Sequence, residues 1–441
     1  MAPLSPSVRR GYALGSVATG TFGTVPGLLL LPYLTDSLGI AAVVAGFIVF
    51  VPKAWDVVLN PIAGRISDRS SSPAGRRRPF LLKGGLALAA CFALLFAGPT
   101  GPPALAGAWV VVWFLACATA YAFFQVPYVA MPAEMTLDYA ERTTLMTWRV
   151  AVLALAILLS GATAPMVVNA FGGEETAKGY RFMGAYVAVI LAIGVYGAWR
   201  GTRDAREHRV ETAAGSLRDQ LRLVSAMPDF RVLLVTFVLQ AMGVGAMLGG
   251  VAYVSDDLLD SDAASTILFA AFVAPALLVT PLWERYAEGR GKKSGYLIAS
   301  GFLVVGSLVL FTARADHAVV VYLAAAIAGV GYAGAQVFPM AMLPDVAAHD
   351  AATSGENRIG VYTGVWTAGE TLGLAIGPGL FALALAIGGY VSSTDHTAVQ
   401  PDSARTAIAV GFSLVPAALI AVSTLFLRRY SLDDLKAIRE H

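Results

Sequence analysis

The chain has 441 residues, of which 57% are hydrophobic and only 14% are charged. Soluble domains carry about 25% charged residues, so this composition excludes an ordinary water-soluble domain. The formal net charge of +2 gives a nucleic-acid-binding role no electrostatic support. Apolar runs of about 18 residues or more recur along nearly the whole length, and each is long enough to cross a bilayer. We therefore expect an integral membrane protein whose surroundings are the lipid bilayer.

The predicted elements are about twelve membrane-spanning helices, separated by charged or Pro/Gly-rich segments. In chain order they cover residues 11–35, 40–66, 79–99, 104–132, 143–171, 181–200, 231–255, 263–283, 294–314, 317–343, 360–389 and 405–428. A membrane β-barrel is excluded because the runs lack the alternation that barrel strands need. The opening stretch MAPLSPSVRRGYALG leads into a run too long for the apolar part of a signal peptide, so we expect the first helix to be retained.

Lys and Arg residues gather in alternate loops. Six lie within 65–83, seven within 200–231, four within 285–293, and four more within 428–439. The loops between these segments hold few, and the loop 255–263 is acidic. The positive-inside rule then places both termini in the cytoplasm, which agrees with an even number of spans. The sequence predicts a multi-pass protein of the cell (inner or plasma) membrane.

The longest polar segment, residues 201–230, separates two halves of six spans each. The loop GRISDRSSSPAGRRRPF between spans two and three is echoed by WERYAEGRGKKSGY between spans eight and nine. We predict an N-terminal six-helix bundle at 1–200, a cytoplasmic linker at 201–230, a C-terminal six-helix bundle at 231–428 and a cytoplasmic tail at 429–441. Two pseudo-symmetric six-helix bundles make an all-α membrane protein with the major facilitator fold.

Four segments carry a family resemblance: PYLTDSLGI; WDVVLNPIAGRISDR with GRRRPF; VPYVAMPAEMTLDYAERTTLMTWR; and LPDVAAHDAATSGENRIGVYTG. With them the chain resembles the glycoside–pentoside–hexuronide:cation symporters of the major facilitator superfamily, whose best-known member is the melibiose permease. The resemblance covers most of the chain. It implies a monomeric secondary active transporter that works by alternating access. Its partners would be a small-molecule substrate and a coupling H+ or Na+, both bound near the midplane between the halves.

Two charges, Lys53 and Asp56, lie halfway along the second predicted span. A charge at the bilayer centre costs about 2.5–3.5 kcal/mol or more, so a functional role is the default interpretation. The spacing of three residues puts both side chains on one helix face. The resemblance assigns Asp56 to cation coupling and matches Lys53 to a family base. The alternative is a neutralising pair that only holds helices together.

The cation site departs from the family at two further positions. The place of a second acid, one turn after Asp56, is taken by Asn60, and Glu370 stands where the family has a lysine. One carboxylate with an amide dehydrates sodium less well than two carboxylates, and a lone desolvated acid suits a proton. Glu370 either carries the proton, with Lys53 or Arg149 responding, or merely neutralises one of those bases. We expect coupling through Asp56, Asn60, Glu370 and Lys53, with a proton favoured over sodium.

The sugar-binding positions also differ. The resemblance implies an acid in span one and another in span four, but here the sequence reads Gly20 or its neighbours, and Gln125. Because glycine cannot accept hydrogen bonds from sugar hydroxyls, we do not expect a galactoside; other glycosides and amphipathic ligands remain open. Several of the candidate residues are aromatic, and these side chains either line the substrate site or only pack against neighbouring helices. The residues expected to contact substrate are Gln125, Arg149, Trp366, Tyr121, Tyr128, Tyr362 and Thr367.

In the superfamily that the chain resembles, charge contacts of the loop after span two hold one conformational state and break in the other. The resemblance therefore implies a gate of ion pairs at the cytoplasmic ends of the spans. The alternative is that the arginines only retain the loop inside the cell. The residues assigned to this gate are Arg65, Asp68, Arg69, Arg77, Glu134, Arg142, Asp345 and Arg358.

Other function classes find little support in the sequence. It has no phosphate loop, metal-ligand spacing or nucleophile elbow, so we expect neither an enzyme nor a cofactor or metal. The prediction is cation-coupled symport of a small glycoside-like or amphipathic solute. Its alternatives are a proton-driven exporter or an uncoupled facilitator of an amphipathic or lipid-like compound. A sensor that binds ligand without flux is a further rival.

Overall fold

The structure is a computed structural model. It describes residues 4–68, 70, 75–136, 139–172, 177–205, 222, 226–261, 263–354, 359–392 and 400–432, although a few side chains within the helices are not described. Throughout these residues the regular secondary structure is helical, as the composition predicts for a bundle in a membrane.

The first six long helices come from the N-terminal part of the chain. They are α1 (Pro6–Pro32) with a π-helical turn η1 (Tyr33–Ser37), α2 (Ala42–Asp68), α3 (Arg78–Leu95), α4 (Pro103–Met135), α5 (Tyr139–Ala170) and α6 (Ala177–Gly201).

The second set follows. It comprises α8 (Pro228–Tyr253) with the π-helical turn η2 (Val254–Leu258), α9 (Ala264–Arg290), α10 (Lys292–Leu310), the short η3 (Ala315–His317), α11 (Ala318–Ser354), α12 (Ile359–Ile387) and α13 (Asp402–Ala409). The last helix continues through η4 (Val410–Leu414) into α14 (Val415–Leu427).

Within the described residues, 12 helices are long and apolar enough to span a membrane, and each coincides with a predicted span. The all-α prediction is therefore confirmed, with differences at the helix ends. α1 begins at Pro6 rather than residue 11, because the Ser5 side chain accepts a hydrogen bond from the Val8 N–H and proline suits the first helical position. α11 continues to Ser354, beyond the predicted end at 343, since charged residues end an apolar run without breaking a helix.

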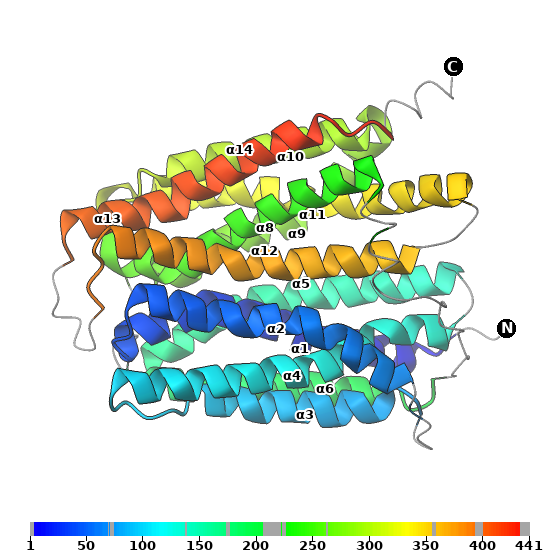
Figure 1. Cartoon of the computed structure of the whole chain (residues 1–441), viewed down its shortest axis with the longest axis horizontal. Helices are drawn as coiled ribbons and strands as arrows, with labels where there is room; N and C mark the ends of the chain where they lie inside the picture. The colour runs from blue at the N-terminus through cyan, green and yellow to red at the C-terminus, as the bar shows by residue number, and fades with distance from the viewer. Residues whose placement is uncertain are drawn as a thin grey trace. The chain divides into compact units, whose positions relative to one another are not determined.

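The helices form two compact units, Met1–Thr212 with Val391–Val399 and Ala213–Tyr390 with Gln400–His441. In the N-terminal unit α1 packs on α5 and α6, α3 on α4 and α6, and α2 on α4. In the C-terminal unit α8 packs on α12 and α14, α10 on α11 and α14, and α9 on α11. The helices of each unit run alongside one another (Figure 1). The same packing scheme is therefore built twice.

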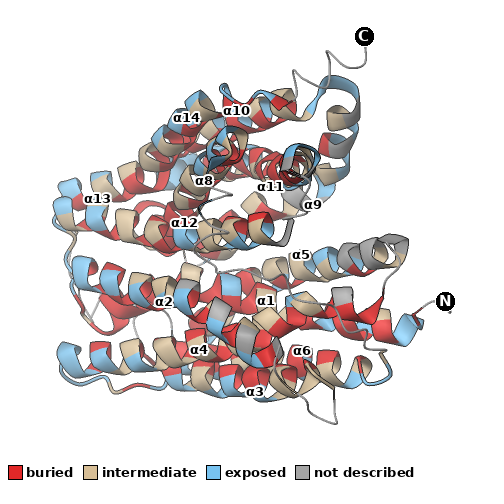
Figure 2. Ribbon diagram, turned by 45° about the vertical axis from the view of Figure 1, so that its right-hand side comes forward, coloured by how far each residue is buried: buried red, intermediate tan, exposed pale blue. Residues whose placement is uncertain are grey.

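The ends of α1 and α8 repeat one another residue by residue. Leu38 N–H donates to Tyr33 O and Ile40 N–H to Leu34 O; at a constant offset, Leu259 N–H donates to Val254 O and Ser261 N–H to Ser255 O. Both helices end in a single π-helical turn. Most of α1 is buried within its unit (Figure 2). The repeat indicates that the two units derive from one six-helix pattern.

Candidate functional site

Asp56 lies on a buried face of α2. Leu59 and Ala63, at helical spacing after it, pack against Ala122 of α4. Asp56 is 3% exposed, and its Oδ1 has no hydrogen-bond donor among the described residues. A different face of α2 carries exposed apolar side chains, as expected for a helix in lipid. These are Phe47, Val51, Trp55, Val58, Ile62 and Ile66. Asp56 therefore does not point toward lipid, and Asn60, one turn later, is half-buried.

Lys53 forms no direct ion pair with Asp56. Its Nζ lies 5.1 Å from the centroid of the Phe22 ring on α1, which is a cation–π distance. The charges of Lys53 and Asp56 still interact through space. The ammonium is thus held by an aromatic face, while the carboxylate keeps an unpartnered oxygen.

Polar side chains of α1, α4 and α5 form what we call the polar strip. Its members are Ser16, Thr19, Gln125, Tyr128 and Arg149. The Tyr128 hydroxyl donates to Tyr12 O at 2.8 Å and lies 3.0 Å from Ser16 Oγ, and the Tyr12 and Tyr128 rings stack. The Arg149 guanidinium lies 5.6 Å from the centroid of the Tyr128 ring. Of the predicted substrate residues, the structure thus brings together Gln125, Tyr128 and Arg149.

Thr19 is the α1 residue that reaches α4 beside Gln125. Its Oγ1 donates to Gln125 Oε1 at 2.8 Å. Gly20 faces α5 instead, where an added Cβ would lie 3.0 Å from Leu153 O and 3.1 Å from the Ala156 Cβ. Sequence comparison pointed to Gly20 or its neighbours without choosing among them. The spacing of Ser16 and Thr19 on one face of an apolar helix was the available signal.

Tyr121 lies one turn from Gln125 on α4. Its ring is 4.7 Å from the Phe22 ring, centroid to centroid. The Lys53 ammonium lies over the other contact of this pair, the Phe22 ring. The α1–α4 seam therefore links the polar strip to the charged residues of α2.

Two predicted aromatic contacts of α12 lie in the core of the C-terminal unit. Trp366 is 1% exposed and stacks on Phe237 of α8 at 4.2 Å between ring centroids, and Tyr362 meets Phe230 edge-on at 4.8 Å. Thr367 is exposed and donates to a carbonyl of its own helix. Packing accounts for Trp366 and Tyr362 in this structure, and their contact with substrate stays a prediction.

Glu370 follows Trp366 by one turn of α12 and is half-buried. Among the described residues of the C-terminal unit it forms no ion pair, and its electrostatic neighbour is Tyr332 of α11. No described base of its own unit therefore neutralises it. Each unit therefore has a predicted coupling acid without an ion-pair partner among the described residues: Asp56 in the N-terminal unit and Glu370 in the C-terminal unit.

The arginines after α2 bind several helices of the N-terminal unit. Arg77 Nε and Nη2 lie 3.0 and 2.8 Å from Glu134 Oε1 on α4, and Arg77 Nη1 donates to Ser67 Oγ of α2 at 2.6 Å. Arg78 donates to Trp199 O of α6 at 3.0 Å. The cluster therefore joins α2, α3, α4 and α6, in addition to any role of its arginines in keeping the loop inside the cell.

The C-terminal unit has a matching ion pair that the sequence did not suggest. Lys292, at the start of α10, lies 2.6 Å from Asp345 Oδ2 on α11 and donates to Ala341 O at 2.8 Å. Arg77 and Glu134 join α3 to α4 in the same manner. The remaining predicted gate side chains lie outside the described part of the structure; these are Arg65, Asp68, Arg69, Arg142 and Arg358.

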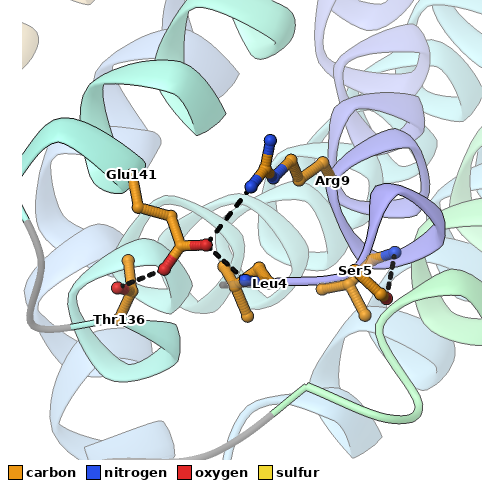
Figure 3. Close-up of polar contacts among 6 residues, drawn as sticks. Leu4, Ser5, Arg9, Thr136 and Glu141 are labelled. Carbon is orange, nitrogen blue, oxygen red and sulfur yellow. Dashed lines mark hydrogen bonds and ion pairs between the residues drawn. The ribbon is translucent and has the colours of Figure 1, made fainter. Parts of the chain in front are cut away.

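A further polar cluster ties the N-terminal segment to the start of α5 (Figure 3). The Leu4 N–H donates to Glu141 Oε1, Thr136 Oγ1 donates to Oε2 at 2.7 Å, and Arg9 Nη2 lies 3.5 Å from Oε1. Burial alone would raise the pKa of the Glu141 carboxyl, but these donors and the Arg9 charge outweigh it and lower that pKa.

Comparison with known proteins identifies the family to which this architecture belongs. A profile of the family described as MFS/sugar transport protein matches residues 11–434. This chain belongs to that family. The family consists of transporters, so the predictions of a major facilitator symporter and of a non-enzyme are confirmed.

Relatives of the family match this chain along nearly its whole length. The isoprimeverose transporter of Lactiplantibacillus pentosus is 23% identical, covering 98% of this chain and 89% of the relative. The sodium-dependent lysophosphatidylcholine symporter 1 of Mus musculus is 23% identical, covering 96% and 85%. A crystal structure of a D-xylose-proton symporter has a TM-score of 0.71 at 14% identity, covering 96% and 97%, which supports the fold. The chain is thus a multi-pass secondary transporter.

Proposed function

We propose that this transporter couples uptake of a small glycoside-like or amphipathic solute to a cation, with a proton favoured over sodium. Asp56 would accept and release the cation, and Lys53, Asn60 and Glu370 would respond to it. Alternating access would move the solute, with the polar strip of the N-terminal unit as part of its binding site. We place it in the cell membrane with both termini in the cytoplasm, in agreement with the distribution of Lys and Arg.

The observation that carries the proposal is the buried carboxylate of Asp56, whose Oδ1 has no hydrogen-bond donor among the described residues. An unsatisfied polar group in a membrane helix is expensive, so its retention points to a role. A proton needs one such oxygen, whereas hard metal cations prefer several oxygen ligands at once. On α2 itself, the prediction adds only the Asn60 amide to the Asp56 carboxylate as an oxygen ligand, which favours the proton.

Both the substrate class and the mode of transport have alternatives. The mouse relative named for lysophosphatidylcholine supports an amphipathic or lipid-like substrate, and the isoprimeverose transporter supports a sugar. Export driven by protons, or uncoupled facilitation, would use the same fold in another mode.

The test uses the full-length protein in proteoliposomes, with imposed proton or sodium gradients. We expect a proton gradient to drive solute accumulation in the wild type, and Asp56→Asn to abolish accumulation while leaving the melting temperature within a few degrees. An exporter would lose outward, not inward, transport in Asp56→Asn, and a facilitator would be indifferent to it.

A complementary measurement is thermal stability of the purified protein with candidate solutes at pH 5.5 and 8, with and without sodium. We expect stabilisation by solute that depends on pH and not on sodium. Stabilisation by sodium that disappears in Asp56→Asn would reverse the choice of proton over sodium.

A further inference from the structure

Helices α3 and α6 lie side by side in the N-terminal unit and run in opposite directions (Figure 1). Arg78, at the start of α3, donates to Trp199 O near the end of α6. At the other end of the pair, an added Cβ on Gly184 of α6 would lie 3.0 Å from the Cβ of Phe96, just after α3. The start of α3 and the end of α6 therefore lie together, at the end of the bundle that we propose to be cytoplasmic.

Each of these two helices has an exposed apolar face with a basic residue at this end. Lys83 begins the exposed face of α3, and Arg200 ends the exposed face of α6. The apolar side chains of the two faces lie at helical spacing from these bases. They are Leu86, Ala90 and Leu94 on α3, and Val189, Ile193 and Tyr196 on α6. A phospholipid has the same order of chemistry, with a charged headgroup at the end of apolar chains.

Lys83 and Arg200 lie at similar depth along the bundle. An added Cβ on Gly85 of α3 would collide with the Val195 side chain of α6, so these two residues are level across the helix contact. Lys83 lies two residues from Gly85, and Arg200 lies five residues from Val195, both toward the same end. At 1.5 Å per residue their depths differ by about 4–5 Å, which is less than the length of either side chain. The two charges can therefore reach one phosphate group between the helices.

These two bases are not neutralised by the protein around them. Among the described residues, no carboxylate forms an ion pair with Lys83 or Arg200. Glu134 of α4 is engaged by Arg77, and Asp204, beyond the end of α6, is exposed and lacks an ion pair with any described base. Exposed basic residues at a membrane surface attract anionic lipid headgroups, so charge complementarity selects an anionic partner.

Aromatic side chains of α6 mark the border between headgroups and acyl chains at the same place. The Trp199 and Tyr196 rings lie 5.7 Å apart, centroid to centroid. The Arg78 guanidinium lies 5.7 Å from the centroid of the Trp199 ring, and it also donates to Trp199 O at 3.0 Å. Because Trp and Tyr prefer the headgroup level of a bilayer, Lys83 and Arg200 stand at the depth of the lipid phosphates.

We propose that the exposed faces of α3 and α6 bind one anionic phospholipid of the surrounding bilayer, with its phosphate between Lys83 and Arg200. Its acyl chains lie along the apolar faces of the two helices. Arg78 is a positioning residue, because its two contacts hold Trp199 beside the headgroup. The lipid is a bound partner and not the transported solute. The inference goes beyond the proposed function and does not depend on it.

The experiment uses purified, delipidated full-length protein in a mild detergent. It is titrated with dioleoylphosphatidylglycerol or dioleoylphosphatidylcholine, which share their acyl chains and differ in net charge, and native mass spectrometry counts the bound lipids. We expect the first phosphatidylglycerol to bind about ten times more tightly than phosphatidylcholine, because only its headgroup complements two cations. Phosphatidylglycerol should also raise the melting temperature, since a ligand that binds only the folded protein stabilises it.

Variants test the two bases. Lys83→Gln and Arg200→Gln should each weaken phosphatidylglycerol binding about tenfold, the effect of one hydrogen bond to a charged group, and leave phosphatidylcholine binding unchanged. Lys83→Arg keeps the charge and should keep the preference. Both positions are exposed, so we expect the lipid-free variants to melt as the wild type does. Lys178→Gln is the matched control, because it removes the same charge from an exposed residue at the other end of α6.

The proposal is overturned if the two lipids bind equally, or if neither binds. It is also overturned if Lys178→Gln weakens phosphatidylglycerol binding as much as Lys83→Gln and Arg200→Gln do, since the effect would then be bulk attraction. Displacement of bound phosphatidylglycerol by glycerol phosphate, which lacks acyl chains, would assign the two bases to a soluble phosphate and overturn the choice of a lipid. Asp56-dependent accumulation is measured separately, so each of these outcomes leaves the transport proposal standing.

Discussion

At the scale of single residues, the candidate site is distinguished by polar groups that lack an internal partner among the described residues. Asp56 has an unpartnered oxygen, whereas Glu141 is surrounded by donors. The two acids differ in surroundings and not in chemistry. Residue type, depth in a span and the family resemblance selected Asp56 and Arg149 as candidates from the sequence, and their roles stay predictions. These criteria were not enough to select Thr19, because the choice between Thr19 and Gly20 depends on how α1 is rotated about its own axis.

Glu141 yields a pH prediction. Its folded-state pKa is lowered, so its contacts stabilise the protein above the ordinary glutamate pKa of about 4.3 and lose that contribution as pH falls through the folded value. We expect Glu141→Gln to lower the melting temperature at pH 7, and the difference from wild type to shrink below about pH 4. Thermal unfolding in detergent at both pH values checks this. An equal difference at both would mean that the charge of Glu141 is irrelevant.

At the scale of helices, small residues decide how closely the axes approach. Gly11 of α1 and Gly201 of α6 meet backbone to backbone, and a Cβ on either would collide with the Cα of the other. Abundant glycine in the spans predicted close packing in general. Which glycine meets which helix followed only from the packing of α1 between α5 and α6.

Two glycines of α1 make a matched test of this packing. We expect Gly11→Ala to destabilise the protein by about 1–3 kcal/mol, because α1 and α6 must separate to admit a methyl group. Gly23→Ala should be neutral or stabilising by up to about 1 kcal/mol, since nothing lies within 4 Å of its added Cβ. Thermal or denaturant unfolding of both variants measures the difference. Equal stability of the two would show that the α1–α6 contact has room for a methyl group.

At the scale of the whole molecule, the pattern is a duplication. The helix pairing, the π-helical ends of α1 and α8, and one ion pair between neighbouring helices recur in each unit. The two ion pairs differ in burial: Arg77 and Glu134 are 8% and 7% exposed, but Lys292 and Asp345 are 29% and 20% exposed. Burial decides how much each pair matters.

We expect Glu134→Gln to cost about 3–5 kcal/mol, because it removes the carboxylate that is paired with the buried Arg77 guanidinium. Asp345→Asn should cost about 1 kcal/mol or less, since water screens Lys292, which also keeps its bond to Ala341 O. Unfolding free energies of the two variants test the contrast. If Asp345→Asn were the more damaging change, burial would not be the deciding term.

The sequence alone determined the membrane class and the twelve spans, because apolar length depends on residue type and not on neighbours. Its motifs indicated the family, and the cost of a charge in lipid made the acids of α2 and α12 candidates for a functional role. Tertiary structure decided that Thr19 rather than Gly20 meets Gln125, that Trp366 belongs to a packed core, and that Arg77 and Glu134 are partners. Those facts depend on the rotation and register of one helix against another. Rotation and register arise from side-chain packing across segments distant in the chain, and no local pattern contains them.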